Sequence, residues 1–291
     1  MKRVIIAALF LCAVTAACGK ETPKENAASG DGDKAAQKSS VRENIYDFKT
    51  EKSEKELVTT LIEDGAVRIE RVISTGQTTD GWYNQEEDEY VVLLDGSAEI
   101  EYKNGRKTSL AKGDSLFISA HEEHRVSFTS ETPPCVWLCA FWPATEGSDI
   151  AGVNFFNLPS LSPDSQSVTQ LLQNASVTVN RIAASGSQAD WQAFPADNYI
   201  VLADGQANVE YESGEKVSLK SGDTLLIPAN ESHKLTDASS EPICVIMSVA
   251  WNAAQPAAQT PETPSATPVE TAPSETPPTT PVETPPTETS E

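Results

Sequence analysis

The sequence predicts an all-β protein built from two copies of one barrel or sandwich domain. Residues 44–76 align without a gap to residues 154–186, and residues 82–142 align without a gap to residues 191–251. Within each copy, apolar residues recur with the two-residue period of β-strands, and turn signals separate many short strands. So long a match indicates an internal duplication, and 291 residues are enough for two domains of ordinary size.

The first copy shows the strand pattern most clearly. The run "YVVLLDG" (90–96) is apolar at nearly every position and ends in a turn, which predicts a strand buried on both faces. "SAEIEY" (97–102) alternates apolar and polar residues, and Asn104-Gly105 after it predicts a hairpin turn. Only residues 53–64 and 164–174 look helical, so we expect one short helix before each barrel.

The N-terminal residues 1–18 are expected to be a signal peptide. A basic start at Lys2 and Arg3 precedes an apolar run that is too short to span a bilayer core of about 30 Å. The segment "TAAC" that ends at Cys18 resembles the cleavage box of bacterial lipoproteins, although Thr15 stands where that family usually has Leu. The resemblance implies that Cys18 becomes the lipid-carrying N-terminus, whereas ordinary secretory cleavage before it is the alternative.

Two segments outside the repeats have the composition of disordered chain. Residues 19–43 are rich in Lys, Glu, Ala, Ser and Gly and show no apolar period, so they are expected to form a flexible linker. Residues 253–291 repeat Pro, Thr and Glu and are expected to form an extended, disordered tail.

The charge of the chain limits the kinds of partner. A formal net charge of −22 argues against nucleic acid, because like charges repel over the range at which steering acts. The expected membrane association is therefore through the N-terminal lipid, in the bacterial cell envelope. Gly19 rather than Asp after the Cys implies, by the same resemblance, the outer membrane facing the periplasm.

Several residues of the first copy resemble the two signatures of the cupin superfamily. They are Glu89 seven positions before Gly96, then Gly113-Asp114, and then His124. The resemblance implies two tandem cupin barrels of the double-stranded β-helix or jelly-roll type, a bicupin similar to small bacterial cupin-2 domain proteins. Domain 1 is expected over residues 44–145 and domain 2 over residues 154–252. The resemblance says little about activity, because cupins include enzymes and pure binding proteins.

The resemblance also implies a site inside the first barrel. A typical cupin metal site takes two His and one Glu from the first signature and one His from the second. Glu89 and His124 stand at matching positions, but the paired histidines are replaced by "WYNQ" (82–85), and His121 stands where the second signature usually has Gly. We therefore expect one divalent transition metal ion to be held by Glu89, His121 and His124. Alternatively, the histidines are solvated, or His124 simply bonds Glu89.

Other residues of the same region are candidates for binding a ligand. Tyr83 and Gln85 are candidates at the mouth of the barrel, and Glu87 is a further oxygen donor two residues from Glu89 on the same strand face.

The second barrel has a degenerate version of this site. Glu89 is replaced by Asn198 and His121 by Asn230, while His233 matches His124. One imidazole and two amides are poor ligands for such an ion, so no metal is expected in domain 2. A pocket for a neutral ligand is the alternative use of this barrel.

These observations leave three functions open. The first is an envelope-anchored bicupin that binds or senses a small-molecule ligand without turnover. The second is a metal-dependent oxygenase or isomerase acting on a small organic acid or sugar. The third is a non-catalytic structural protein of the envelope. Cupin domains often form dimers, so a homodimer is possible. The internal duplication can, however, pair two cupin domains within one chain.

Overall fold

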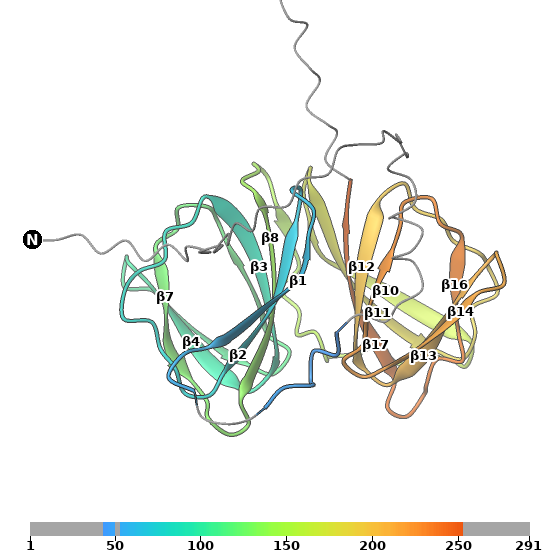
Figure 1. The fold of residues 1–291 in the computed structure, drawn as a ribbon, viewed down its shortest axis with the longest axis horizontal. Helices are drawn as coiled ribbons and strands as arrows, with labels where there is room; N and C mark the ends of the chain where they lie inside the picture. Colours follow the sequence, from blue (N-terminus) through green and yellow to red (C-terminus); the bar gives the residue numbers. More distant parts are fainter. Residues whose placement is uncertain (1–42, 50–52, 253–291) are drawn as a thin grey trace, which may run out of the picture. The chain divides into compact units, whose positions relative to one another are not determined.

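The computed structural model describes residues 43–49 and 53–252, and these residues contain no helix. Two groups of strands follow each other along the chain (Figure 1). The first comprises β1 (Leu57–Glu63), β2 (Arg68–Ser74), β3 (Glu87–Asp95), β4 (Ser97–Tyr102), β5 (Lys107–Ala111), β6 (Ser115–Ile118), β7 (His124–Thr129) and β8 (Cys135–Pro143). The second comprises β10 (Ser165–Gln173), β11 (Val177–Ser185), β12 (Asp197–Asp204), β13 (Gln206–Tyr211), β14 (Lys216–Lys220), β15 (Thr224–Ile227), β16 (His233–Thr236) and β17 (Cys244–Trp251).

Each group forms a barrel from two antiparallel sheets. The first barrel has the sheet β1-β2-β8-β3-β6 and the smaller sheet β5-β4-β7. The second barrel has β10-β11-β17-β12-β15 and β14-β13-β16 in the same order, with the short β9 (Asp149–Ile150) added beside β10. The predicted all-β architecture of two similar barrels is therefore confirmed.

The two predicted helices, over 53–64 and 164–174, are wrong, because β1 and β10 occupy these stretches. Leu57 and Val58 with Leu61 and Ile62 give an apolar pattern close to that of a helix. In the structure a register shift lies between Thr60 and Ile62, so the neighbours Leu61 and Ile62 are both buried. Such a bulge breaks the two-residue alternation by which strands are recognised. β10 has the same shift between Gln170 and Leu172.

The predicted signal peptide, the tail and, apart from Glu43, the linker lie outside the described residues. Within the described part of the chain, no helix is long and apolar enough to cross a membrane.

The continuous apolar run of β3 has a simple explanation, because both of its faces are buried. Val91 and Leu93 face the interior of the first barrel, whereas Tyr90, Val92 and Leu94 face a second core outside it. β8 alternates in the same way. The prediction of a strand buried on both faces is thus confirmed.

The second core is shared by the two barrels. β12 and β17 contribute to it as β3 and β8 do, through Tyr199, Val201, Met247 and Val249 among others. The larger sheets of the two barrels therefore pack on one continuous apolar cluster. Neither barrel could expose this face to water without losing the hydrophobic stabilisation that the cluster provides.

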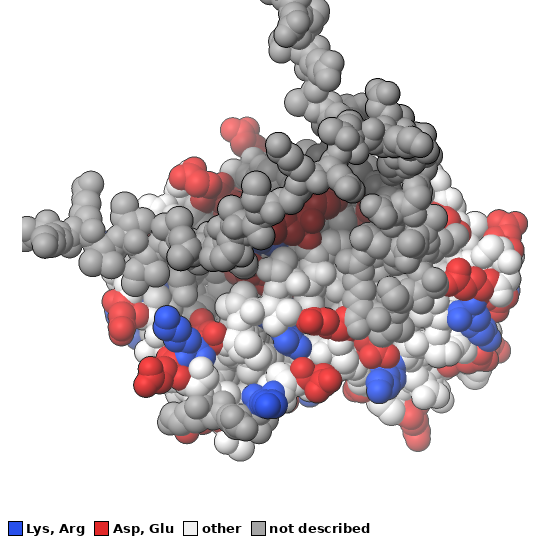
Figure 2. Space-filling model, in the orientation of Figure 1, with Lys and Arg blue, Asp and Glu red and all other residues white. Residues whose placement is uncertain are grey.

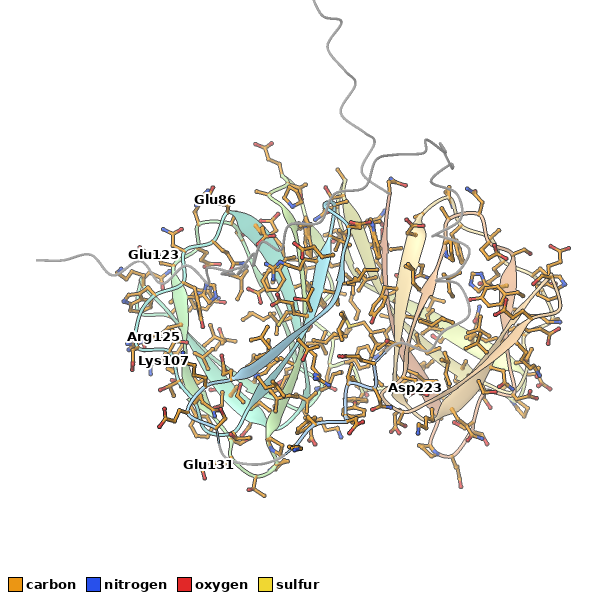
Figure 3. The ribbon with its side chains drawn as sticks, viewed as in Figure 1. Glu86, Lys107, Glu123, Arg125, Glu131 and Asp223 are labelled. Carbon is orange, nitrogen blue, oxygen red and sulfur yellow. The ribbon has the colours of Figure 1, made fainter. Side chains whose placement is uncertain are left out.

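A short segment before each barrel is docked on the other barrel. The side-chain amide of Asn44 donates to the Ser221 carbonyl and to the Asp223 carboxylate, both at 2.8 Å, in the turn before β15. Figure 3 shows Asp223 close to this N-terminal segment. In the same way, Asn154 donates to the Lys112 carbonyl at 2.9 Å and to the Asp114 carboxylate at 2.8 Å. The exchange is reciprocal.

A buried arginine fixes each segment to its own barrel. Nη1 of Arg71 in β2 is 3.3 Å from the carbonyl oxygens of Asn44 and Asp47. Nη1 of Arg181 in β11 is 3.1 Å from the Asn154 carbonyl and 2.9 Å from the Asn157 carbonyl. Each segment therefore bridges the two barrels, with an arginine on one side and a Gly-Asp turn on the other.

We expect Gly113→Ala to destabilise the protein more than Gly105→Ala does. The two glycines have nearly the same φ, 86° and 88°, so both substitutions carry a left-handed backbone cost of about 1–2 kcal/mol. A Cβ at Gly113 would also collide with the Asn154 side chain, whereas nothing lies within 4 Å of a Cβ at Gly105. The collision should add about 1–3 kcal/mol. Urea unfolding of the two variants measures the difference, and equal losses would show that docking of Asn154 contributes nothing.

Candidate ligand-binding site

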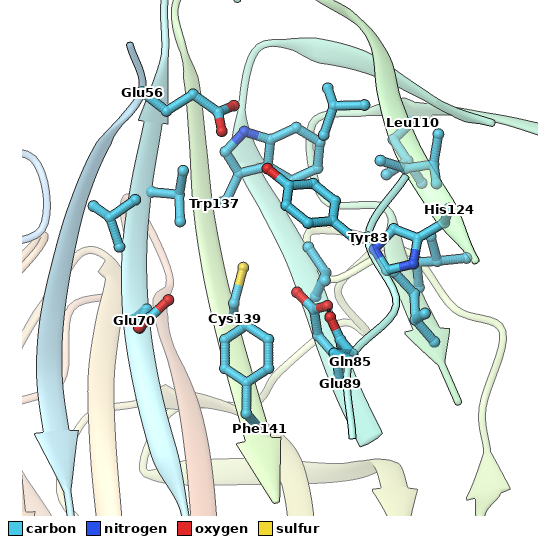
Figure 4. A pocket seen from close by; sticks show the side chains of 17 residues that line it. Glu56, Glu70, Tyr83, Gln85, Glu89, Leu110, His124, Trp137, Cys139 and Phe141 are labelled. Carbon is cyan, nitrogen blue, oxygen red and sulfur yellow. Dashed lines mark hydrogen bonds between the residues drawn. The ribbon is translucent and has the colours of Figure 1, made fainter. Parts of the chain in front are cut away.

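The first barrel contains a cavity of about 260 Å³ that is partly open to solvent. Every strand from β1 to β8 contributes to its wall, which is mostly apolar. The volume corresponds to roughly nine water molecules at about 30 Å³ each, so the space suits a small organic molecule. Figure 4 shows the polar side chains that reach into it.

Three carboxylates from different parts of the barrel line this cavity. Glu56 precedes β1, Glu70 lies in β2 and Glu89 lies in β3. No Lys or Arg is present among the described residues that line the cavity. The wall therefore combines apolar surface with a concentration of negative charge.

Glu89 is the most enclosed of the three carboxylates, at 7% exposed. Its carboxylate accepts a hydrogen bond from the Gln85 amide at 3.1 Å and another from the Cys139 thiol. Burial raises the pKa of Glu89 from 4.5 to about 7, because these two bonds only partly offset the loss of solvation. The same burial raises the pKa of the Cys139 thiol far above its ordinary value, so the thiol stays protonated.

Glu56 and Glu70 have different partners. The Ser74 hydroxyl donates to Glu56 at 2.6 Å and accepts from the Trp137 indole N–H at 2.9 Å. Burial raises the pKa of Glu56 despite this bond. Glu70 instead forms an ion pair with Arg68 at 2.5 Å. Only Glu70, therefore, has a cationic partner among the described residues.

His124 brings a neutral imidazole to the cavity. The residue is 4% exposed, and burial lowers its pKa, so the ring is uncharged at neutral pH. Its Nδ1 lies 2.8 Å from the Glu122 carbonyl oxygen, which can only accept. The proton is therefore on Nδ1, and Nε2 is left as an acceptor. Tyr83 covers the ring at a centroid distance of 5.5 Å and is held by backbone hydrogen bonds to His124.

The structure does not bring the three predicted metal ligands together. His121 lies in the turn before β7 with φ 62°, and its side chain is 60% exposed beside Asn84 and Glu86. It does not line the cavity, whereas Glu89 and His124 do. This corrects the prediction that both imidazoles face one ion, and the physical reason is the left-handed turn that directs His121 outward. The described residues 43–49 and 53–252 hold no group of three or more His, Cys, Asp or Glu side chains that could bind a metal.

The predicted ligand-binding residues divide in a similar way. Tyr83 and Gln85 line the cavity, as expected. Glu87 does not, because its carboxylate is bonded to Arg68 at 2.8 Å. The two-residue period of the strand predicts that Glu87 points into the barrel, as Glu89 does. The ion pair with Arg68 holds its side chain away from the cavity instead.

The second barrel has a cavity of about 410 Å³ at the equivalent place. Asn198 and His233 line it, but Asn230 shares the left-handed turn of His121, with φ 63°, and does not. The Ser248 hydroxyl donates to the Asn198 carbonyl oxygen at 2.8 Å, which reproduces the Cys139–Glu89 pair with neutral groups. No Asp or Glu is present among the described residues that line this cavity.

Sequence reasoning missed Glu56, Glu70, Trp137 and Cys139. Their convergence depends on closure of the barrel, which brings β1, β2 and β8 around one space. One signal was nonetheless available in the aligned repeats. In the alignment of the two copies, Glu56, Glu70 and Glu89 correspond to Gln166, Asn180 and Asn198. Each carboxylate of the first copy is therefore an amide in the second.

Comparison with known proteins identifies the family. Residues 70–141 match the family model described as "Cupin domain". The chain belongs to the cupin superfamily. Its fold is similar to that of a cupin 2 conserved barrel domain protein from Leptotrichia buccalis, with 14% identity, 74% of this chain and 98% of that chain covered, and a TM-score of 0.59.

Two further solved structures resemble this cupin. A mutant of oxalate decarboxylase from Bacillus subtilis has 11% identity, with 74% of this chain and 78% of that chain covered and a TM-score of 0.53. A putative mannose-6-phosphate isomerase from Ralstonia eutropha has 33% identity, with 35% of this chain and 97% of that chain covered and a TM-score of 0.34. No curated protein matches the chain.

The stability of this cupin should depend on the ionisation of Glu89. A pKa raised on folding means that its contribution to stability is fully present below pH 4.5 and is lost as the pH rises through about 7. Glu89→Gln removes this loss, so the variant should gain about 3 kcal/mol relative to the wild type between pH 5 and pH 8. Urea unfolding at both pH values measures the change.

The control for this measurement is Glu86→Gln, because the Glu86 side chain is 89% exposed. That variant should follow the wild type at both pH values. Parallel stability profiles for Glu89→Gln and the wild type would contradict the assignment of a raised pKa to Glu89.

Proposed function

We propose that this cupin binds a small organic ligand inside the first barrel, through its own side chains rather than through a metal ion. The observation that supports the proposal is the half-open cavity of about 260 Å³, in which an apolar wall surrounds a few polar groups from separate strands. Pockets of this composition are the usual sites for small ligands in proteins. A purely structural barrel would gain stability by filling such a space with apolar side chains.

The donor set of the cavity does not suit a divalent transition metal. Such an ion needs three or more convergent ligands, and His121 lies outside the cavity. Glu89 is already bonded to Gln85 and Cys139. Binding or sensing is therefore favoured over metal-dependent oxygenase or isomerase chemistry.

We further propose that the binding domains are anchored in the bacterial cell envelope. The support is the signal-peptide pattern of residues 1–18 with Cys18 at the end of "TAAC", together with the linker composition of residues 19–43. A lipid at Cys18 would hold both barrels near the membrane, at a distance that the linker permits.

A ligand of the first barrel should stabilise the protein, and filling the cavity should abolish the effect. We expect a thermal-shift screen of small metabolites to find compounds that raise Tm, since a ligand at 100 times its Kd stabilises by about 2.7 kcal/mol. Val126 lines the cavity, and Val126→Trp should fill it and remove the shift. The matched control is Leu235→Trp at the equivalent position of the second barrel, which should keep the shift. Shifts that survive Val126→Trp would place the ligand elsewhere.

The anchor has its own test. In a host that processes lipoproteins, the wild-type protein should fractionate with membranes, and Cys18→Ala should move it to the soluble fraction. The reason is that an acyl chain contributes about 0.8 kcal/mol for each buried CH₂ group. Unchanged fractionation of Cys18→Ala would contradict lipidation at this residue.

A further inference from the structure

The two barrels have the same strand order, but the side chains that line their cavities differ in charge. Three carboxylates of the first cavity, Glu56, Glu70 and Glu89, are replaced by three amides at the equivalent positions. The amide set shows that the fold itself needs no negative charge at these places. A carboxylate without an ion pair is costly where it is buried, as Glu89 is, so its presence in one barrel calls for a functional reason.

The hydrogen-bond inventory of the first cavity contains more acceptors than donors. The Gln85 amide and the Cys139 thiol both donate to Glu89, and the Trp137 indole donates to Ser74. The three carboxylates and Nε2 of His124 keep acceptor capacity that these few donors do not fill. A ligand that satisfies this cavity must therefore be rich in donors.

The charges around the cavity further limit the kinds of ligand that it can bind. Arg68 forms an ion pair with Glu70, whereas the hydrogen-bond partners of Glu56 and Glu89 among the described residues are neutral. A neutral polyol would donate hydrogen bonds, but it would bring no positive charge to a carboxylate that is ionised, as Glu89 is above about pH 7. Oxalate decarboxylase acts, by its name, on an anion, which these carboxylates would repel.

The aromatic rings of the cavity also suit a cation. Tyr83 and Trp137 both line the space, and Figure 4 shows them beside the carboxylate of Glu56. Aromatic faces attract ammonium groups through the ring quadrupole. In the second barrel the equivalents are Gln192 and Ile246, so these rings are lost together with the charges.

From these observations we infer that the first barrel binds a small organic cation: a protonated amine carried on an apolar body. An ammonium group offers three donors and one positive charge, which matches the excess of acceptors and of negative charge. A volume of about 260 Å³ leaves room for an apolar body that packs on the remaining wall. A metal ion would fill little of this space and would find no convergent set of ligands. The inference rests on the proposed function, whose cavity it uses.

The test compares amines with alcohols of the same shape. Calorimetric titration of the full-length protein at pH 7.5 would use three pairs: benzylamine and benzyl alcohol, cyclohexylamine and cyclohexanol, and 3-methylbutylamine and 3-methylbutanol. We expect at least one amine to bind at least tenfold more tightly than its alcohol, because only the amine forms charge-assisted hydrogen bonds.

Variants of the chain then assign the preference to the carboxylates. Glu89→Gln and Glu56→Gln should each weaken amine binding by about tenfold. The triple variant Glu56→Gln, Glu70→Asn, Glu89→Asn gives the first cavity the amides of the second, and it should abolish the preference for the amine. Glu86→Gln removes one negative charge from an exposed side chain and should change nothing. The Tm of each variant without ligand reports its folding, and the single variants serve if the triple variant does not fold.

The outcomes separate this inference from the proposed function. If alcohols bind as tightly as amines, or if the amine preference survives in the single and triple variants, the cation inference is overturned. The cation inference also fails if no amine binds. In that case, the proposed function still holds if a neutral ligand binds to the wild type and not to Val126→Trp. Ligands that bind equally well to Val126→Trp would overturn the proposed function itself.

Discussion

The structure depends on strands that are apolar on both faces. β3 and β8 in the first barrel, and β12 and β17 in the second, have one face in a barrel interior and the other in the core shared by the barrels. A fully buried Leu or Phe side chain contributes about 1.5–3 kcal/mol, so the shared core binds the two barrels strongly to each other. The strands that form the wall of the candidate site therefore pack on the second barrel with their outer face, which is not exposed to water. Few charged side chains lie on these strands, and Glu89 in β3 is one of them. In Figure 2 Lys and Arg stand among Asp and Glu on the visible surface of the described residues.

This arrangement lets the two faces of one strand vary independently between the copies. On the shared face, Tyr90 and Trp142 have the same residues as counterparts in the second copy, Tyr199 and Trp251, and all four are almost fully buried. On the inner face, Cys139 has Ser248 as its counterpart and Trp137 has Ile246. The largest side chains of the shared face are therefore kept, because close packing penalises a change of volume there. Smaller side chains do differ, since Leu94 and Ala140 correspond to Ala203 and Val249. The inner face borders a cavity, where a change alters the candidate site without disturbing a packed neighbour.

The fold was predictable from the sequence because it follows from local patterns and from the repeat. Period-two alternation, Gly turns and the aligned copies are all visible without coordinates, and the resemblance to cupin signatures implies the inward positions of Glu89 and His124. The helices were mispredicted because a bulge makes a strand read as a helix, and His121 was misplaced because a left-handed residue reverses the side-chain direction within a turn. Glu56 and Glu70 belong to the site only through barrel closure, which no local pattern encodes.

The acidic cavity also has an energetic meaning for the molecule as a whole. Glu89 forms no ion pair within the described part of the chain, and its raised pKa indicates that the folded state holds the ionised carboxylate less favourably than water does. A barrel with such a site is less stable than one with amides, and the second barrel has the amides. Because the two barrels share one core and exchange their leading segments, the second barrel can support the fold of the first. A stable barrel interior has its hydrogen bonds and charges satisfied, whereas the proposed binding site needs an interior with few donors and no positive charge. These two demands conflict in a single barrel. Duplication lets one barrel meet the first demand and the other barrel meet the second.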